Sequence, residues 1–204
     1  MFTDLSRQAL TGLRALLVLT VVLGVAYPLV VWGAGQALGD RAQGQPVRLD
    51  GEVVGSRLLG QQFEGEGWFH SRPSANDHDS LASAPSNLGP SSPDLLELIA
   101  QRRTEVAEIE GVEAADVPPD ALTASGSGLD PHVSPAYAAL QVPRVARARG
   151  LEEEQVRDLV AEATDGRALG FLGEPGVNVL ALNLALEQAA PRSASPDTAG
   201  GQGD

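Results

Sequence analysis

The sequence predicts a water-facing mixed α/β (α+β) domain tethered by a single N-terminal transmembrane helix. Three observations predict this arrangement. Residues 15–39 form one uncharged apolar run, two Ser-Pro pairs at Ser92 and Ser134 have the form of helix starts, and leucines alternate along residues 177–186 as in a strand. Because no later stretch matches the length of the apolar run, we expect one membrane crossing followed by one folded portion.

The run at residues 15–39 is long enough to span a bilayer. A helix rises about 1.5 Å per residue, so about 20 apolar residues cross a hydrocarbon core of about 30 Å. A cleaved signal peptide is the main alternative, since residues 16–27 have a suitable length and Gly33 to Gly35 are small. The apolar residues continue through Trp32, however, which favours a retained anchor. A buried helix of a soluble domain is disfavoured, because such helices usually carry a polar face.

Single residues within the run indicate how it packs. Pro28 removes one backbone donor, so we expect a bend there. Tyr27 and Trp32 are amphipathic rings, and Trp32 has the position of an outer-interface ring. Gly35 and Gly39 have the small-xxx-small spacing that lets a second helix approach closely.

Composition excludes several classes of function. The 204-residue chain has no Cys, which excludes disulfides and thiolate metal sites. All 14 basic residues are Arg, so neither the lysine of a P-loop nor a Schiff-base amine is present. The formal charge of -13 argues against a nucleic-acid partner, because that partner requires a basic surface.

Charges beside the apolar run predict its orientation. Arg7 and Arg14 precede the run, and Arg14 abuts it with no acidic residue nearby. The positive-inside rule therefore favours a cytoplasmic N-terminus. The resulting organisation is a cytoplasmic segment at 1–14, a transmembrane helix at 15–39, an extracytoplasmic α/β domain at 40–187 and a disordered tail at 188–204.

Behind the run, the pattern is irregular. Residues 43–51 read as a polar linker, and residues 53–63 as a strand interrupted by glycines, with Trp68 to His70 as its partner. Residues 72–93 have the composition of a disordered loop. A loop this long inside a domain is either functional or mobile.

Three helices are predicted in the second half. The first begins at Ser92-Pro93 and covers residues 94–109, and its expected buried stripe is Leu95, Leu98, Ile99, Arg102, Val106 and Ile109. After turns at residues 122–135, a second runs from Pro135 to about Gln141. It is interrupted at Pro143 and resumes through Arg149 to a stop at Gly150.

The third predicted helix covers residues 152–163, with Val156, Leu159 and Val160 on one face. Residues 164–173 turn the chain back. Residues 177–186 then read as a strand whose apolar face carries Leu180, Leu182, Leu184 and Leu186.

The residues offer no evident active centre. His70, His78 and His132 are the only histidines, and the cluster Asp77-His78-Asp79 matches no zinc spacing. Residues 125–128 lack the Gly-x-Ser-x-Gly order of a nucleophile elbow. Ser127, Asp130 and His132 lie too close in sequence for a fold to assemble them as a catalytic triad.

The turns at residues 122–135 carry a motif, TASGSGLDPH at 123–132 followed by Ser134-Pro135, that resembles the C subunit of the bacterial potassium-transporting ATPase, the Kdp system. Other matching stretches agree in order and spacing from residue 13 to residue 186. They are GSRLLGQ at 55–61, FHSRPSA at 69–75, SNLGP at 86–90, QVPRVARARG at 141–150, LGFLGEP at 169–175, VNVL at 177–180 and LNLAL at 182–186.

Two positions depart from the family pattern. The family typically has Ser-Gly-Gly-Ser-Asn before Leu-Gly-Pro, whereas this chain has Ala84-Pro85-Ser86-Asn87. An Arg usually precedes Val-Asn-Val, and here the residue is Gly176, which removes a positive charge beside Glu174. The first departure affects the expected loop conformation, and neither removes the resemblance.

The resemblance implies a non-catalytic subunit that is needed for assembly and stability of an ATP-driven potassium importer in the bacterial cell (inner) membrane. Its implied partners are a channel-like potassium-binding subunit, a P-type ATPase pump subunit and a small stabilising subunit. Two roles are implied: raising the ATP affinity of the pump subunit, or covering the potassium entrance from outside. No firmly bound cofactor is implied, and ATP enters only through the pump subunit. The charges beside the apolar run favour the second role, because they place the domain outside the membrane.

Site residues follow from the same resemblance. Gln141 matches a position implicated in nucleotide handling, and Arg144, Arg147 and Arg149 lie beside it, where we expect a solvated basic edge. We expect Gly126 and Gly128 to hold backbone angles closed to other residues. The residues expected to be structural are Arg72, Pro73, Ser74, Asn87, Gly89, Ser125, Gly126, Ser127, Gly128, Leu129, Asp130, Pro131, Glu174 and Asn178.

A membrane-tethered extracytoplasmic hydrolase or binding module is the alternative. A hydrolase requires a pocket with converging titratable groups, whereas a subunit requires an exposed docking surface.

Overall fold

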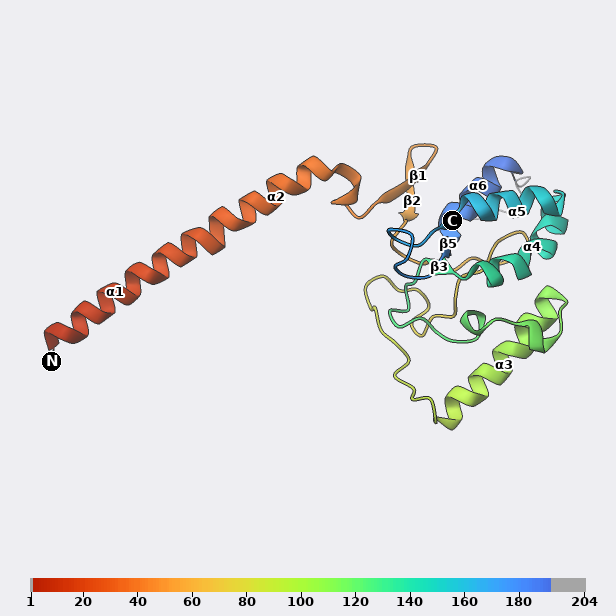
Figure 1. Cartoon of the computed structure of the whole chain (residues 1–204), viewed down its shortest axis with the longest axis horizontal. Coiled ribbons are helices and arrows are strands. Elements are labelled where there is room, and N and C mark those ends of the chain that lie inside the picture. Colours follow the sequence, from red (N-terminus) through yellow and green to blue (C-terminus); the bar gives the residue numbers. More distant parts are fainter. Residues whose placement is uncertain (1, 192–204) are drawn as a thin grey trace, which may run out of the picture. The chain divides into compact units, whose positions relative to one another are not determined.

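The computed structural model describes residues 2–191, which form two units that we treat separately (Figure 1). The first unit ends at Gln45 and the second begins at Pro46. Most of the predicted tail, residues 192–204, lies outside the described residues. Gln188 and Ala189 belong to the last helix, so the tail begins later than the predicted residue 188.

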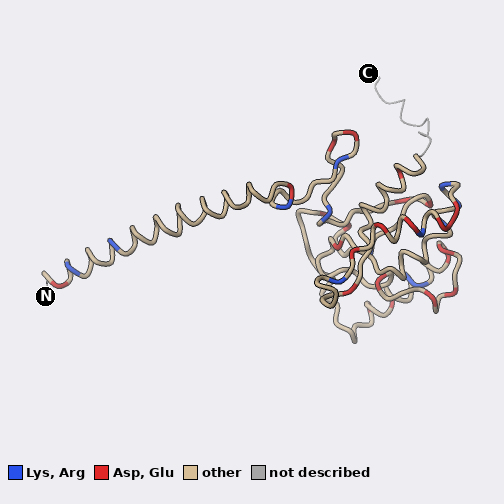
Figure 2. The backbone as a smooth tube through the Cα atoms, turned by 45° about the horizontal axis from the view of Figure 1, so that its top comes forward, with Lys and Arg blue, Asp and Glu red and all other residues tan. Residues whose placement is uncertain are grey.

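A long helix makes up most of the first unit. It consists of α1 (Phe2–Val21), a π-helical turn η1 (Val22–Ala26), α2 (Tyr27–Leu38) and a 3-10 turn η2 (Gly39–Arg41). The stretch Thr3–Arg41 is long and apolar enough to cross a membrane. Figure 2 shows charged residues only towards its two ends. The predicted helix is confirmed, and it begins well before residue 15.

The π-helical turn follows from Pro28. The Tyr27 N–H donates to the carbonyl of Val22, five residues back instead of four. Proline has no N–H, so the helix continues through Pro28 by widening the turn before it. Of the two glycines with small-xxx-small spacing, Gly35 lies within α2, whereas Gly39 is its C-cap with φ of 55°. The approach of a second helix at these glycines stays a prediction.

A hairpin opens the second unit. β1 (Pro46–Leu49) pairs antiparallel with β2 (Glu52–Ser56), with an irregularity between Val47 and Arg48. Asp50 and Gly51 connect the strands with φ of 51° and 88°, as a two-residue hairpin turn requires. The predicted linker is therefore partly a strand. The predicted partner, Trp68 to His70, is not a strand.

A second sheet joins three short strands in the order β3-β5-β4. β3 (His132–Val133) and β4 (Thr164–Asp165) each pair antiparallel with β5 (Gly176–Asn178). Val177 at the centre of β5 is fully buried. This small sheet brings the 125–135 turns next to the 164–176 segment.

Helix α3 (Pro93–Glu110) confirms the first predicted helix, with Ser92 as N-cap and Gly111 as a left-handed C-cap. Its predicted stripe is half-buried, except that Ile109 is 52% exposed. The last inward position belongs instead to Glu110, whose carboxylate pairs with Arg144. The 3-10 turns η3 (Ala114–Asp116) and η4 (Pro119–Ala121) follow α3.

Helix α4 (Pro135–Arg149) runs without interruption, so the predicted break at Pro143 is wrong. Pro143 leaves the carbonyl of Ala139 without its helical donor, and Ala139 is exposed to water, which can supply one. Gly150 is the left-handed C-cap, as predicted. Helix α5 (Glu153–Glu162) is also confirmed, and its N-cap Glu152 forms a capping box with Gln155.

Residues 179–189 form helix α6 (Val179–Ala189), so the predicted strand at 177–186 is wrong beyond Asn178. The Asn178 side chain accepts from the Ala181 N–H and begins the helix. Leucine alternation misled the prediction, because the buried residues follow a helical spacing: Val179, Leu180, Leu182, Asn183 and Leu186.

The core of the second unit lies among α4, α5, α6 and β5 (Figure 1). Its fully buried large side chains include Phe69, Val145, Val156, Leu182 and Leu186. Phe69 comes from a segment without helix or strand. The backbone of that segment therefore needs hydrogen-bond partners from other elements to stay in the core.

Candidate functional site

An extended segment at residues 66–70 lies against α4 and α6. Asn183 of α6 accepts from the Phe69 N–H at 2.9 Å and donates to the Phe69 carbonyl at 2.9 Å. Gln141 of α4 accepts from the His70 N–H at 2.7 Å and donates to the His70 carbonyl at 3.2 Å. Each side-chain amide thus takes the place that a peptide group of a neighbouring strand would occupy.

Two arginines of α4 continue this pattern. The Arg144 Nη1 donates to the carbonyls of Glu66 at 2.6 Å and Trp68 at 2.9 Å. The Arg149 Nε donates to the Gly67 carbonyl at 2.7 Å, and its guanidinium lies 4.4 Å from the Trp68 ring centroid. We call Gln141, Arg144, Arg149 and Asn183 the clamp, because together they bind every residue of the 66–70 segment.

Both clamp arginines are paired with carboxylates. Arg144 contacts Glu110 of α3 at 3.0 Å, and Arg149 contacts Glu187 of α6 at 2.7 Å. The Arg144–Glu110 pair is almost fully buried. Burial raises the pKa of Glu110, and the hydrogen bond and charge of Arg144 oppose the rise. The pair therefore ties α3 to α4 in a nearly dry environment.

The predicted solvated basic edge at Arg144, Arg147 and Arg149 is wrong for two of its three members. Arg144 and Arg149 form ion pairs inside the domain, and of the three only Arg147 is exposed. Gln141 is 0% exposed, and its amide oxygen also accepts from Arg144 Nη2 at 2.9 Å. The arginines do not converge on an open surface beside Gln141.

The motif turn at residues 125–131 is a junction between distant segments. Its backbone forms hydrogen bonds with three such segments. The Ser125 N–H donates to the Pro73 carbonyl, the Leu129 carbonyl accepts from the Gly60 N–H, and the Pro131 carbonyl accepts from the Val179 N–H. The Ser127 carbonyl accepts from Ser83 Oγ, and Ser127 Oγ accepts from the Leu129 N–H. The expectation that this turn is structural agrees with these contacts.

Gly128 and Gly126 differ. Gly128 has φ of 71°, and a Cβ there would lie 2.1 Å from Asn76 Oδ1 and 3.1 Å from the Ala84 carbonyl. At Gly126 a Cβ would meet nothing within 4 Å, and its φ is not positive. The expected backbone constraint is thus confirmed for Gly128 and wrong for Gly126.

Ser74 fixes the polar 72–93 loop to this turn. Its hydroxyl donates towards the Gly128 carbonyl at 2.8 Å and accepts from the His78 N–H at 3.0 Å. Asn76 extends the contact by donating to the Ala82 carbonyl at 2.6 Å. The loop has no regular secondary structure before Ser92, yet specific hydrogen bonds hold its first half.

The other motif residues are dispersed. Asn178 caps α6 and donates to the Arg57 carbonyl. Asn87 is an exposed residue with φ of 56°, and the carbonyl of the exposed Gly89 accepts from the Ser92 N–H. Glu174 forms an exposed ion pair with Arg167 at 2.8 Å.

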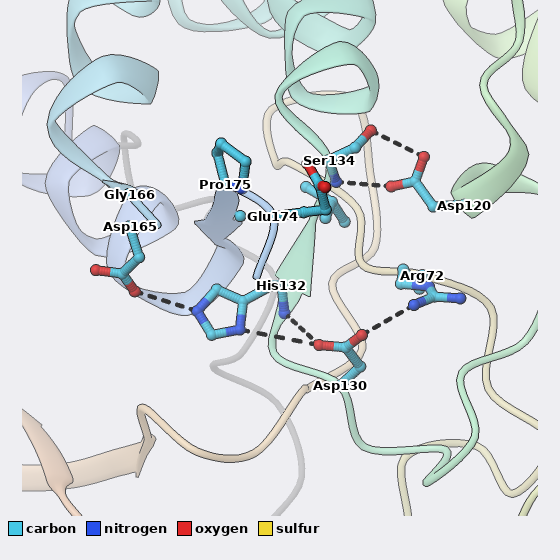
Figure 3. Close-up of a pocket in the computed structure, with 11 residues that line it drawn as sticks. Arg72, Asp120, Asp130, His132, Ser134, Asp165, Gly166, Glu174 and Pro175 are labelled. Atoms are coloured by element: carbon cyan, nitrogen blue, oxygen red, sulfur yellow. Dashed lines mark hydrogen bonds and ion pairs between the residues drawn. The ribbon is translucent and has the colours of Figure 1, made fainter. Parts of the chain in front are cut away.

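Beside the motif turn, an open cleft of about 460 Å³ gathers charged side chains (Figure 3). Asp130 accepts from Arg72 at 3.0 Å and from the His132 N–H at 3.0 Å. The His132 ring lies between two carboxylates, with Nε2 3.2 Å from Asp165 and Nδ1 3.9 Å from Asp130. Glu174 lines the same cleft.

The cleft does not assemble a hydrolytic centre from the described residues. Ser134 caps α4, and its hydroxyl donates to Asp120 at 2.8 Å rather than to a histidine. Ser127 is not a lining residue. Across residues 2–191, no group of three or more His, Asp or Glu side chains is placed to hold a metal ion. The carboxylates around His132 therefore act here as partners of protein groups.

An exposed apolar loop lies in the chain between residues that line the cleft, Gly166 and Glu174. We call residues 168–172 the apolar loop: Ala168 and Leu172 exchange two backbone hydrogen bonds of 2.9 Å and close it. Leu169 is 83% and Phe171 68% exposed. Leu169 has φ of 54°, which costs a residue with a Cβ about 1–2 kcal/mol. With Leu172, which is 49% exposed, the fold thus presents three large apolar side chains to solvent on a defined turn.

Sequence reasoning missed three residues of this structure: Glu110, Asn183 and the partly exposed Trp68 that stacks on Arg149. A signal existed for Asn183, because it interrupts the leucines of residues 180–186 and a lone amide there requires a partner. The sequence contained no such signal for Glu110, since an acidic residue at a helix end usually faces water.

Comparison with known proteins decides the family. The family model described as K+-transporting ATPase, c chain (KdpC) matches residues 9–188. The chain belongs to this family. It is 61% identical over 191 residues to the potassium-transporting ATPase KdpC subunit of Kineococcus radiotolerans, which covers 93% of this chain and 97% of the relative.

Two further relatives carry the same name. The KdpC subunit of Mycobacterium tuberculosis is 50% identical over 186 residues, covering 89% of this chain and 98% of the relative. That of Sorangium cellulosum is 54% identical over 182 residues, covering 87% and 96%. The family resemblance expected from the motifs is confirmed, and it includes both the N-terminal helix and the second unit.

Replacing Gln141 by Leu should destabilise the second unit. The change leaves both polar groups of the His70 backbone and one donor of Arg144 unpaired, at about 1–3 kcal/mol for each buried group. Denaturant unfolding of the purified chain measures the loss. Gln101→Leu on the exposed side of α3 is the matched control, and we expect a change within about 0.5 kcal/mol. Unchanged stability in Gln141→Leu, with a weaker ATP response of the complex, would instead favour a nucleotide contact.

Stability should also fall on mild acidification. Burial, followed by the charge of Arg144, lowers the pKa of His70, and burial lowers the pKa of His78. As the pH falls below 6.5, the unfolded state therefore binds more protons than the folded state. The free energy of unfolding is highest above that pH and decreases as the pH falls through it. Unfolding measured between pH 7.5 and about 5.5 tests this. A double His70→Gln, His78→Gln variant should lose most of the slope, and an unchanged slope would contradict the assignment.

Proposed function

We propose that this chain is a non-catalytic, membrane-anchored subunit that holds a potassium-transporting ATPase complex together. The observation that carries the proposal is the apolar loop, which exposes Leu169 and Phe171 on a closed, strained turn. Single exposed leucines are common at protein surfaces. Two large apolar side chains that are exposed together on a turn with a strained backbone favour a docking surface. The proposal therefore assigns the loop to contact with another subunit.

A protein surface suits this loop better than a lipid surface. Of 27 acidic and 14 basic residues, only Asp4, Arg7 and Arg14 precede residue 15, which leaves 26 acidic and 12 basic residues after it. A region this acidic is repelled by anionic headgroups. The apolar loop itself contains no basic residue, and the Arg167 before it is paired with Glu174. An apolar pocket on a partner subunit is consistent with both features.

The proposed partners are the channel-like potassium-binding subunit, the P-type pump subunit and the small stabilising subunit of the complex. In this proposal the pump subunit alone binds ATP. The position of Gln141 supports this division, because its amide is fully buried and bonded to His70 and Arg144. Gln141 then affects nucleotide handling only through the shape of the domain.

We further propose that the second unit lies outside the cell (inner) membrane. Arg7 and Arg14 before the apolar stretch support a cytoplasmic N-terminus under the positive-inside rule. The acidic charge beyond the helix supports an outside location as well, since two of the three arginines beside Gln141, Arg144 and Arg149, are paired with carboxylates inside the domain. A role over the potassium entrance is compatible with this side, and a direct ATP contact is not.

Replacing Leu169 and Phe171 together by Ser should weaken assembly without unfolding the chain. Burial of one such side chain contributes about 1.5 to 3 kcal/mol, so we expect at least about a tenfold lower recovery of the complex by affinity purification. Thermal unfolding should change little, because both side chains are exposed. Leu81→Ser, at a residue 95% exposed elsewhere, is the matched control. Normal recovery of the double variant would refute the docking role.

Sidedness has a direct test, because the chain contains no Cys. Leu81→Cys should react with an impermeant thiol reagent added to intact spheroplasts. Thr3→Cys, before the apolar stretch, should react only after lysis. The reverse pattern would place the second unit in the cytoplasm and restore a direct role for Gln141 in ATP binding.

A further inference from the structure

The first half of the polar loop is attached at both of its ends to the motif turn. We call residues 74–83 the strap. At its start, Ser74 Oγ lies 2.8 Å from the Gly128 carbonyl, and at its end Ser83 Oγ donates to the Ser127 carbonyl at 2.9 Å. The strap therefore occupies the hydrogen-bond positions of two neighbouring carbonyls of the turn.

Polar contacts hold the strap, and apolar packing contributes little. Its one large apolar side chain, Leu81, is 95% exposed. Asn76 closes the strap internally by donating to the Ala82 carbonyl. Asp77 and His78 have φ of 53° and 57°, a left-handed conformation that residues with a Cβ rarely adopt. A segment with few buried apolar contacts and a strained backbone opens at a lower free energy than the core.

Histidines of two segments line one cavity. This cavity of about 240 Å³ receives His78 from the strap and His70 from the segment that the clamp holds. Arg72 lines it as well, and among the described residues of its wall Asp77 is the single carboxylate. Arg144 of α4 adds its positive charge near His70. A proton on either ring therefore enters surroundings in which one carboxylate opposes two arginines.

Both histidines resist protonation while the strap is closed. Burial, followed by the charge of Arg144, lowers the pKa of His70, and the Gly65 carbonyl 3.1 Å from Nε2 opposes this in part. Burial lowers the pKa of His78, and the charge of Asp77 opposes it. Opening the strap returns the His78 ring to water, where the ordinary pKa of about 6.5 applies. The closed strap is thus favoured above that pH and is lost as the pH falls through it.

We propose that the strap is an acid-sensitive cover of the motif turn, which protonation of His70 and His78 releases while the helical core stays folded. Release frees the Ser127 and Gly128 carbonyls for other hydrogen-bond donors. The clamp remains in place, because it binds the backbone of His70 and not the ring. The strap responds in this way whichever partner the apolar loop contacts.

Hydrogen exchange of the purified full chain at about pH 7.5 and about pH 5.5 tests the release. Labelling times are scaled so that a free amide exchanges equally at both pH values. The amides of His78, Asp79 and Ala82 donate hydrogen bonds within the strap, and their protection should fall several-fold at the lower pH. Peptides of α5 should change much less. An unchanged strap, or an equal fall in α5, would overturn the proposal.

Replacing both histidines by Gln isolates their titration. Glutamine keeps a polar side chain that does not change charge, so the strap of the His70→Gln, His78→Gln variant should be equally protected at both pH values. His78→Gln alone should already reduce the response, and it leaves the contact of His70 with Gly65 intact. A fall in protection as large as that of the unchanged chain would contradict the role of the histidines.

Ser74→Ala should open the strap without acid. The change removes the contacts to the Gly128 carbonyl and to the His78 N–H, so the strap should be weakly protected at both pH values. Ser80→Ala, at an exposed serine of the same segment, is the matched control and should keep both the protection and its loss in acid. Full protection of the strap in Ser74→Ala at neutral pH would refute this attachment to the motif turn.

Discussion

The second unit depends on the clamp, in which side chains of α4 and α6 bond the backbone of an extended segment. The segment places Phe69 in the core, although no strand pairs with it there. Gln141 and Asn183 each satisfy one N–H and one carbonyl, and the two arginines satisfy three more carbonyls. Buried backbone groups must be paired, so the segment lies in the core only while these four side chains stay in position.

The clamp also explains why polar residues of the family motif lie inside the domain. Gln141 and Arg144 belong to the QVPRVARARG stretch, to which the family resemblance assigns nucleotide handling and whose arginines suggest a basic surface. Their burial turns that stretch into a structural element that joins α3, α4 and residues 66–70. The surface that we propose for contact with partners is the apolar loop, and the approach of a second helix to the N-terminal helix stays a prediction.

Sequence patterns predicted the elements whose signals are local. Ser92-Pro93 and Gly150 marked helix ends correctly, because caps depend on a few adjacent residues. Residues 177–186 failed, since alternating leucines satisfy a strand and a helix pattern equally until Asn178 is recognised as a cap. The clamp could not be predicted from the sequence, because buried Glu110 and Arg144 stabilise each other only after α3 and α4 pack together.

The hydrogen bonds between Phe69 and Asn183 join residues 114 positions apart. Loop closure over such a distance is slow compared with helix formation, so this contact forms late in folding. A chain emerging from its N-terminus exposes Phe69 and its unpaired backbone until α6 has also emerged. The second unit therefore completes its core only near the end of its own synthesis, and a truncation within α6 would leave residues 66–70 as an unprotected, aggregation-prone segment.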